Sequence, residues 1–470
     1  MNPMPSLLIA IASYGTAQDN YLEKLLAEYR NLRMPSSVVV LSNQFKPVRG
    51  AEVIVGLPSS DPYSLPFAHR KLFAENAEKF DLYVYTEDDT LLSEKHIEAF
   101  LDVQAKLEKN EIPGFLRSET SPEGKKYITS IHHHFRWLPD TVVRRDGEIF
   151  AQLSNQHSGC FIATREQLRI AIASGGFLVE PRSRVYGMLE TAASDIYTQC
   201  GLRRLLCLSR IHEFIVPHLA NKYYSQMGVC YEELAIQAKT LGDLYQKRNW
   251  RGSLFNPQTK APGFRWSKNL YDKPDEELLR TVPPSVKNLL SIGSGSGANE
   301  EWLRKNGIDV CAVPVDAVFG EALRSRGIRT VEGSLEKVIE SLKGERFDMI
   351  LISGMLHLVN NPVNWLTKLG RLLSPEGILI ADVCNTSSPL SWLRDWRDGQ
   401  GRTFSPNHES IGAHYVNARR LRSWCRSSGL EVIQIIPLIG STRRIVRQIG
   451  RGPLKAALSE RFILKARRPV

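Results

Sequence analysis

The chain has 470 residues, which exceeds the roughly 100–200 residues of one typical domain, so we expect at least two folded domains. Its formal charge of +11 at pH 7 favours anionic partners. No apolar run approaches the ~18 residues of a membrane-spanning helix, and the start lacks the basic region of a signal peptide. The seven cysteines are scattered and never in C-x-x-C spacing, which is typical of a reducing compartment. We therefore expect a cytoplasmic protein without a transmembrane span.

The N-terminal part alternates apolar strands with amphipathic helices. Strands are expected at residues 7–13, 38–41, 53–55 and 82–85. A helix is expected at residues 21–32 and another at residues 66–80. This rhythm predicts an α/β domain.

Three consecutive acids, Glu87, Asp88 and Asp89, follow the strand at residues 82–85. Carboxylates crowded at a strand end repel one another unless a cation or a basic partner neutralises them. Such oxygen-rich sites suit Mg²⁺ or Mn²⁺ shared with substrate phosphates. The alternative is an acidic turn in solvent that caps a helix starting near Ser93, because acids favour helix N-termini.

With this strand, triplet and preceding helix, residues 6–224 resemble the GT-A glycosyltransferases, in which a D-x-D-type triplet holds a divalent ion on a sugar-nucleotide diphosphate. The resemblance implies a metal site in which Asp89 is a direct ligand, Glu87 makes a ribose or water-mediated contact, and His218 closes the site in preference to His212. It also implies a nucleotide-sugar pocket. Its residues would be Ser13, Tyr14, Gly15, His69, Arg70, Lys71 and Asp88.

The helical stretch Y-G-M-L-E-T-A-A-S-D-I-Y carries two acids, Glu190 and Asp195. By the same resemblance, one of them would deprotonate an acceptor hydroxyl if the enzyme inverts the sugar, and we prefer Glu190. Either could equally be an ordinary charged helix residue.

Residues 225–284 are predicted to be a connector with some order. It holds a helix near residues 231–248 and then a segment with Pro, Gly and Trp. The aromatic residues are too many for a floppy linker.

Residues 287–297, K-N-L-L-S-I-G-S-G-S-G, combine an apolar strand with alternating glycines before a helix. Such a loop turns sharply and lets backbone N–H groups approach a ligand closely, and the N-terminus of the following helix faces the same ligand. The predicted cofactor contacts are Gly293, Ser294, Gly295 and Gly297. A simple Gly/Ser turn is the alternative. A nicotinamide or flavin site, suggested by G-x-G-x-x-A, ranks lower because too little chain remains for a second mononucleotide half and a substrate domain.

Further strands follow the glycine loop in alternation with helices. They are expected at residues 309–316, 328–331 and 347–353, with a fifth, I-L-I-A-D-V, after the turn S-P-E-G. This order predicts a doubly wound parallel sheet.

From about residue 286 to 468, these elements resemble the class I S-adenosylmethionine-dependent methyltransferases. The resemblance implies S-adenosylmethionine at the glycine loop, Asp316 beside its ribose, and Ser334 or Glu336 beside its adenine. The chain departs from the family pattern in lacking an acid two residues before the first glycine, where Ser291 stands. The fold class we expect is therefore two Rossmann-like α/β domains, residues 1–224 and 285–470, joined by the connector.

His357, just past the fourth strand, is a candidate general base. Methyl transfer from a sulfonium depends mostly on positioning, and sometimes on a base for a sugar hydroxyl. The alternative is a loop histidine satisfied by the backbone.

Residues 438–449 interleave arginines with apolar side chains. Such a segment indicates contact with an anionic membrane surface at the inner face, or with a polyphosphate-bearing acceptor. A solvated cationic helix is the alternative.

Our main hypothesis is a bifunctional enzyme of cell-surface polysaccharide biosynthesis. It would transfer a sugar from a nucleotide sugar, and a methyl group from S-adenosylmethionine, to a glycan or lipid-linked glycan. The second hypothesis is a methyltransferase with a non-catalytic N-terminal glycan-binding module. A nucleic-acid methyltransferase is not expected, because the basic segment has few aromatics to stack bases.

Overall fold

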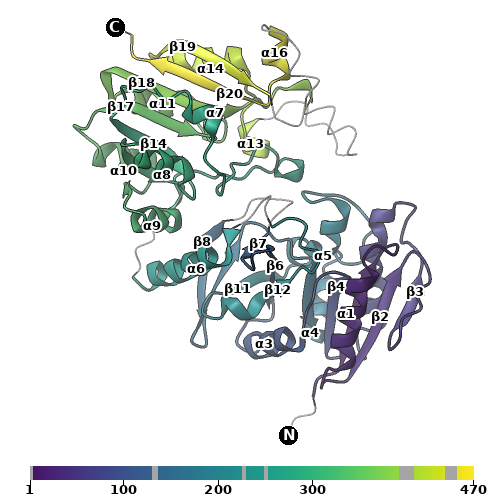
Figure 1. Cartoon of the computed structure of the whole chain (residues 1–470). Coiled ribbons are helices and arrows are strands. Elements are labelled where there is room, and N and C mark those ends of the chain that lie inside the picture. Colours follow the sequence, from purple (N-terminus) through teal and green to yellow (C-terminus); the bar gives the residue numbers. More distant parts are fainter. Residues whose placement is uncertain are drawn as a thin grey trace. The chain divides into compact units, whose positions relative to one another are not determined.

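The computed structural model describes residues 4–129, 136–224, 229–247, 252–390, 407–439 and 453–469. The chain forms two compact units, residues 1–248 and 249–470 (Figure 1). The predicted connector is divided between them. Its helix α6 (Tyr231–Gln246) belongs to the first unit, and everything after residue 248 belongs to the second. No helix among the described residues has the length and apolar character needed to cross a bilayer.

The first unit is built on a five-stranded sheet in the order β10-β4-β1-β2-β3. Its strands are β1 (Leu7–Ser13), β2 (Ser36–Ser42), β3 (Glu52–Val55), β4 (Leu82–Glu87) and β10 (Cys160–Thr164). The first four run parallel, and β10 pairs antiparallel with β4. Every residue of β1 is buried, as expected for a central parallel strand covered on both faces.

Two of the helices expected in this unit, at residues 21–32 and 66–80, correspond to α1 and α2. In α1 (Asp19–Arg30), Leu22, Leu25, Leu26 and Tyr29 form the buried face. The helix expected at residues 66–80 is shorter than predicted. A 3-10 turn, η1 (Pro62–Phe67), comes first, and α2 covers only Ala68–Glu75. Pro66 lies in the 3-10 turn, where its missing N–H is tolerated.

Two smaller sheets complete the first unit. One has the order β5-β11-β9-β8 and the other β12-β6-β7-β13. Their strands are β5 (Glu111–Pro113), β6 (Leu116–Thr120), β7 (Lys126–Ile128), β8 (Trp137–Arg145), β9 (Glu148–Leu153), β11 (Arg203–Cys207), β12 (Ile215–Pro217) and β13 (Val229–Cys230). The helices α3 (Glu94–Gln104), α4 (Arg165–Ala173) and α5 (Met188–Thr198) accompany them.

The second unit is built on a seven-stranded sheet in the order β16-β15-β14-β17-β18-β20-β19. Its strands are β14 (Asn288–Ser294), β15 (Asp309–Pro314), β16 (Arg329–Thr330), β17 (Phe347–Ser353), β18 (Leu373–Cys384), β19 (Glu431–Leu438) and β20 (Arg461–Arg467). The first five strands run parallel, and β20 is antiparallel to both of its neighbours. The mixed α/β fold expected from the sequence is confirmed.

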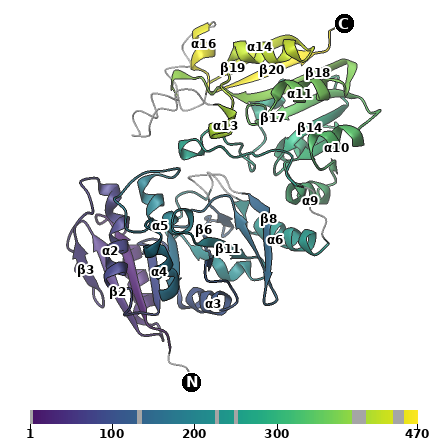
Figure 2. The same ribbon diagram turned by 180° about the vertical axis from the view of Figure 1, so that it is seen from behind.

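Helices cover both faces of this sheet. They are α7 (Glu276–Leu279), α8 (Ala298–Lys305), α9 (Ala317–Ser325), α10 (Leu335–Ser341), α11 (Pro362–Gly370), α13 (His408–Ile411), α14 (Ala418–Ser427) and α16 (Pro453–Leu458). Figure 2 shows α11 and α14 side by side near β18 and β20. Along β14, Leu290 and Ile292 belong to one apolar cluster and Leu289 to another. Because neighbouring side chains of a strand point to opposite faces, the sheet has a core on each side.

Candidate functional site

The glycine loop of the second unit connects β14 to α8. Gly293 and Gly297 have φ angles of +81° and +85°, in the left-handed region that favours glycine. A Cβ atom at Gly295 would collide with the carbonyl oxygen of Leu270. The glycines are therefore required by the turn and by another part of the chain that crosses it.

That crossing segment, residues 252–272, is here called the strap. The Leu254 amide donates to the carbonyl of Val315 (2.7 Å), and the Ser296 amide donates to the carbonyl of Leu270 (2.7 Å). The strap thus lies against the ends of β14 and β15, at the carboxyl edge where parallel sheets bind cofactors. The sequence predicted only a connector here, and the aromatic content of the strap was the one signal of its packing.

A buried carboxylate lies under the glycine loop. Glu300, in the first turn of α8, accepts hydrogen bonds from the hydroxyls of Ser291 (2.6 Å) and Ser294 (2.7 Å). Its side chain is almost completely buried. The acid that the family pattern puts at position 291 is absent, and α8 supplies a carboxylate to the same place. Sequence reasoning missed Glu300.

The residues predicted to contact the ribose and the adenine make hydrogen bonds or ion pairs within the second unit. Asp316 follows β15 and caps α9, with its Oδ1 accepting from the amides of Val318 (3.0 Å) and Phe319 (3.2 Å). Ser334 caps α10. Glu336 is exposed, and the Lys368 ammonium (2.7 Å) holds its pKa below the usual value.

His357 is fully buried just after β17. Its Nε2–H donates to the carbonyl of Trp266 in the strap (2.8 Å), and within the described part of the chain its Nδ1 has no hydrogen-bond partner. Burial lowers the pKa of His357 to about 4, so the ring is neutral at pH 7. Because Nε2 carries the proton, Nδ1 presents a lone pair. The predicted base therefore has an unprotonated ring nitrogen, and this nitrogen is buried.

In the first unit, the three acids at the end of β4 are held by neighbouring side chains. Asp88 accepts from the Ser13 hydroxyl (2.6 Å), and Arg117 lies 3.6 Å from a carboxylate oxygen of Glu87. Only 8% of Asp88 and 7% of Asp89 are exposed, which excludes the alternative of an acidic turn in solvent. Burial raises the pKa of Glu87 to about 8 and that of Asp88 to about 6.

His218 lies between two carboxylates. Its Nε2 is 3.0 Å from Oδ2 of Asp89, and its Nδ1 is 2.5 Å from Oε1 of Glu119. Although burial raises the pKa of Asp89, the hydrogen bond and charge of His218 outweigh it and hold that pKa below the ordinary value. His212, by contrast, is exposed. Within the described residues, no group of three or more His, Cys, Asp or Glu side chains is arranged to hold a metal ion.

His69, Arg70 and Lys71, predicted to contact a nucleotide sugar, lie at the start of α2. His69 is buried against Tyr85, with Nδ1 2.6 Å from the carbonyl of Pro66. Lys71 is exposed and reaches Glu75. Successive helical residues point in different directions, so the three side chains diverge.

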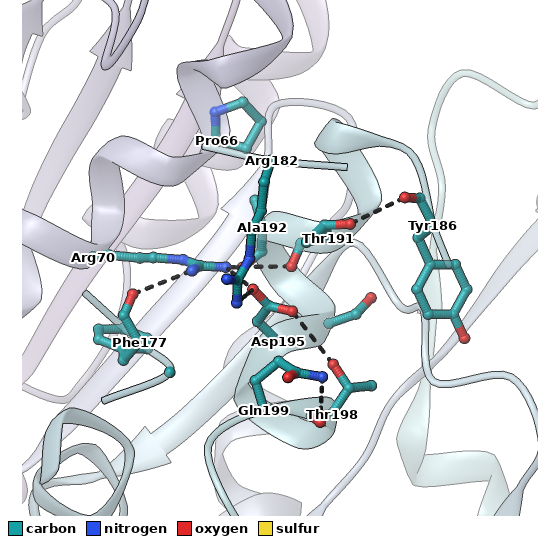
Figure 3. A network of polar contacts seen from close by, with 12 residues as sticks. Pro66, Arg70, Phe177, Arg182, Tyr186, Thr191, Ala192, Asp195, Thr198 and Gln199 are labelled. Carbon is teal, nitrogen blue, oxygen red and sulfur yellow. Dashed lines mark hydrogen bonds and ion pairs between the residues drawn. The ribbon is translucent and has the colours of Figure 1, made fainter. Parts of the chain in front are cut away.

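Arg70 is the centre of a buried polar network (Figure 3). Its guanidinium donates to a carboxylate oxygen of Asp195 (3.2 Å) and to the carbonyls of Phe177 (3.1 Å) and Ala192 (2.9 Å). Arg182 lies 3.8 Å from the same carboxylate. Asp195 is therefore committed to an ion pair that anchors α5, which makes it a poor candidate for a base.

Glu190 lies in the first turn of α5 and is nearly buried. Its charge contributes to the raised pKa of Glu87, so it lies within electrostatic reach of the acid triplet. The geometry favours Glu190 over Asp195 as the acid nearer to that triplet.

Of the remaining residues predicted to line the nucleotide-sugar pocket, Tyr14 is half-exposed and the Gly15 amide donates to the side-chain oxygen of Asn43 (2.8 Å).

The arginine-rich stretch expected at residues 438–449 lies outside the described residues from position 440 onward. Its membrane and polyphosphate interpretations stay predictions.

Comparison with known proteins gives matches to methyltransferases. Residues 266–435 match a family model described as a methyltransferase domain. Uncharacterized methyltransferases of Mycobacterium bovis and Mycobacterium tuberculosis are 28% identical over 141 residues, which is 29% of this chain and 56% of each relative. The chain thus spans little more than half the length of these curated relatives.

Solved structures of two methyltransferases are also similar. One, from Archaeoglobus fulgidus, has 14% identity and a TM-score of 0.33, over 41% of this chain and 91% of that one. The other, from Mesorhizobium loti, has 18% identity and a TM-score of 0.31, over 40% and 95%. None of these proteins is named as a glycosyltransferase.

Proposed function

Since the C-terminal region of the chain is a class I S-adenosylmethionine-dependent methyltransferase domain, we propose that the protein methylates a glycan that its N-terminal unit recognises. The observation that carries the methyltransferase part is the family match over residues 266–435, which includes the glycine loop and the end of the strap, residues 266–272. The glycan is inferred from the likeness of the first unit's sequence to sugar-nucleotide enzymes.

The residues at the carboxyl edge of the second sheet fit this cofactor. Gly293 and Gly297 form the sharp turn at the end of β14, and Asp316 lies at the end of β15, where such sheets bind the ribose of a cofactor. S-adenosylmethionine, when bound, supplies a methyl group on a positively charged sulfur. The loop, the strap and Asp316 would hold it in line with the acceptor.

His357 would act on the acceptor through its Nδ1 lone pair. A base with a pKa of about 4 is too weak to remove a hydroxyl proton in the resting state. It can orient the hydroxyl by accepting its hydrogen bond, and take the proton as the oxygen becomes acidic during methyl transfer. This role suits an O-methyltransferase.

Titration with S-adenosylhomocysteine tests the cofactor assignment. A ligand that binds only the folded state raises the melting temperature, by an amount set by its concentration relative to the dissociation constant. We expect S-adenosylhomocysteine to stabilise the second unit and NAD to have no effect. Stabilisation by NAD alone would overturn the assignment.

A second candidate function is metal-dependent sugar transfer by the first unit, which would require His218 to give up the Nε2 proton that it donates to Asp89. Glu119 fixes Nδ1 of His218, which directs Nε2 toward Asp89, as second-sphere carboxylates do for metal-binding histidines. One carboxylate and one imidazole suit a Mg²⁺ or Mn²⁺ ion that takes its remaining ligands from substrate phosphates and water. If the first unit transfers a sugar, Glu190 would be the base that deprotonates the acceptor hydroxyl.

Asp89→Asn separates sugar transfer from simple glycan binding. If the first unit is a transferase, the variant loses Mn²⁺-dependent hydrolysis of sugar nucleotides and keeps methyl transfer. The matched control is Asp102→Asn, a change at an exposed acid that Arg210 contacts on the surface. If the wild-type protein shows no metal-dependent hydrolysis and still binds glycans, the non-catalytic module is the better description.

A further inference from the structure

Lys268 is a buried cation at the carboxyl edge of the second sheet. It belongs to the strap, and only 8% of the residue is exposed. Its Nζ donates to the carbonyl of Ser353, the last residue of β17 (2.5 Å). The next residue is Gly354, where a Cβ atom would stand 3.5 Å from Nζ. The ammonium therefore lies where β17 ends, on the strap that also crosses the glycine loop.

The hydrogen-bonding capacity of this ammonium is largely unused. A lysine ammonium has three N–H donors, and the described residues offer Nζ one hydrogen-bond acceptor and no ion-pair partner. Burying a charge without a partner is costly, so such groups are normally paired or bind a ligand. Desolvation accordingly lowers the pKa of Lys268.

Carboxylates surround Lys268 at longer range. Asp272, Glu300 and Asp382 all act on it electrostatically. Two of these have nearer partners, because Glu300 is bonded to the serines under the loop and Asp382 to Arg461 (3.1 Å). The site thus combines a positive group with spare donors and a negative surrounding field. A ligand end that carries both a carboxylate and an ammonium is complementary to this arrangement.

We propose that Lys268 binds the carboxylate of the methionine end of S-adenosylmethionine, with the surrounding acids facing its ammonium. This inference rests on the proposed methyltransferase function. Charge-assisted hydrogen bonds from a buried ammonium to a carboxylate are among the stronger polar contacts in proteins. Their loss is expected to weaken binding about 10- to 100-fold.

The test compares two ligands on matched variants by calorimetry, a readout independent of turnover. S-adenosylhomocysteine has the amino-acid end, and 5′-methylthioadenosine lacks it. Lys268→Met should weaken S-adenosylhomocysteine about 10- to 100-fold and leave methylthioadenosine unchanged. Lys260→Met, an exposed position on the same strap, should change neither. Equal weakening of both ligands, or no change in either, would overturn the assignment.

A second measurement needs no variant. With the wild-type protein, the decarboxylated analogue of S-adenosylhomocysteine should bind about 10- to 100-fold more weakly than the parent compound. Equal affinity would mean that the carboxylate contributes nothing to binding, and would overturn the proposal. If the wild-type protein binds no S-adenosylhomocysteine at all, the proposed methyltransferase function fails, and this inference fails with it.

Discussion

The two units differ in whether the charged and basic side chains at their sheet edges have partners within the unit. In the first unit, Asp88 and Asp89 are matched by a hydroxyl and an imidazole of the same unit. In the second, His357 has a bare ring nitrogen and Lys268 has unused donors, both judged against the described residues. Polar groups that a fold satisfies internally contribute to its stability, whereas buried groups with spare capacity await a ligand. The comparison therefore contrasts acids that are paired within the first unit with two basic side chains of the second unit that keep spare hydrogen-bonding capacity.

The largest effect should come from breaking the internal pairing of the first unit. Arg70→Met leaves the buried Asp195 carboxylate with the Thr198 hydroxyl at 3.4 Å and, among the described residues, Arg182 as its one cation at 3.8 Å. Breaking a buried ion pair on one side typically costs about 3–5 kcal/mol. Denaturant unfolding of the first unit measures the loss. Lys71→Met, on the same helix and exposed, is the control and should cost less than about 0.5 kcal/mol. Similar costs for both variants would contradict the structural role of Arg70.

The pH dependence of stability should have opposite signs in the two units. His357 titrates near pH 6.5 when unfolded and at about 4 when folded, so protons favour its unfolded state. This difference in pKa lowers the free energy of unfolding of the second unit by about 2 kcal/mol as the pH falls from 7 to 5. Glu87 has a pKa raised from 4.5 to about 8, so its contribution to the first unit is greatest below pH 4.5 and is lost as the pH rises to 8.

Thermal unfolding followed at several pH values measures both trends. His357→Gln should remove the acid-side loss of the second unit, and Glu87→Gln should remove the alkaline-side loss of the first. A His357→Gln protein with unchanged pH dependence would show that other groups control the second unit.

A smaller effect is expected at the carboxylate under the glycine loop. Glu300→Ala leaves two buried hydroxyls, those of Ser291 and Ser294, without their shared acceptor. Unsatisfied buried polar groups cost about 1–3 kcal/mol, so we expect a loss of about 2 kcal/mol, measured by denaturant unfolding of the second unit. Glu301→Ala, at the adjacent position with an i,i+4 partner in Lys305, should cost less than about 0.5 kcal/mol. Equal losses would argue against a specific role of Glu300.

The smallest effect should be at Glu336. Glu336→Gln breaks an exposed ion pair with Lys368, which is worth less than about 1 kcal/mol. We expect S-adenosylhomocysteine affinity to change by less than about twofold. A large loss of affinity would instead restore Glu336 as a contact of the adenine.

The sequence predicted those parts of the fold that local patterns determine. The apolar run of β14 and its glycines indicated a strand, a sharp turn and a helix, and the structure has all three. The strap escaped prediction because its order comes from contacts with strand ends, such as that between Leu254 and Val315, which are distant in sequence. The burial of His69 and Arg70 was not predicted, because it depends on contacts with distant residues such as Phe177 and Asp195. Lys268 gave no sequence signal, since a lysine in a loop is ordinarily solvated.

The strand order of the second sheet has a consequence for how this unit assembles. β20 lies between β18 and β19 but follows both in the chain. During synthesis, β19 emerges from the ribosome with no neighbour to pair with until β20 arrives and joins it to the rest of the sheet. Arg461, the first residue of β20, then bonds to Asp275 (3.0 Å) and Asp382 (3.1 Å), connecting residues that precede β14 with the end of β18. Completion of the sheet is therefore a late, non-local event, and such steps slow folding and prolong exposure to aggregation.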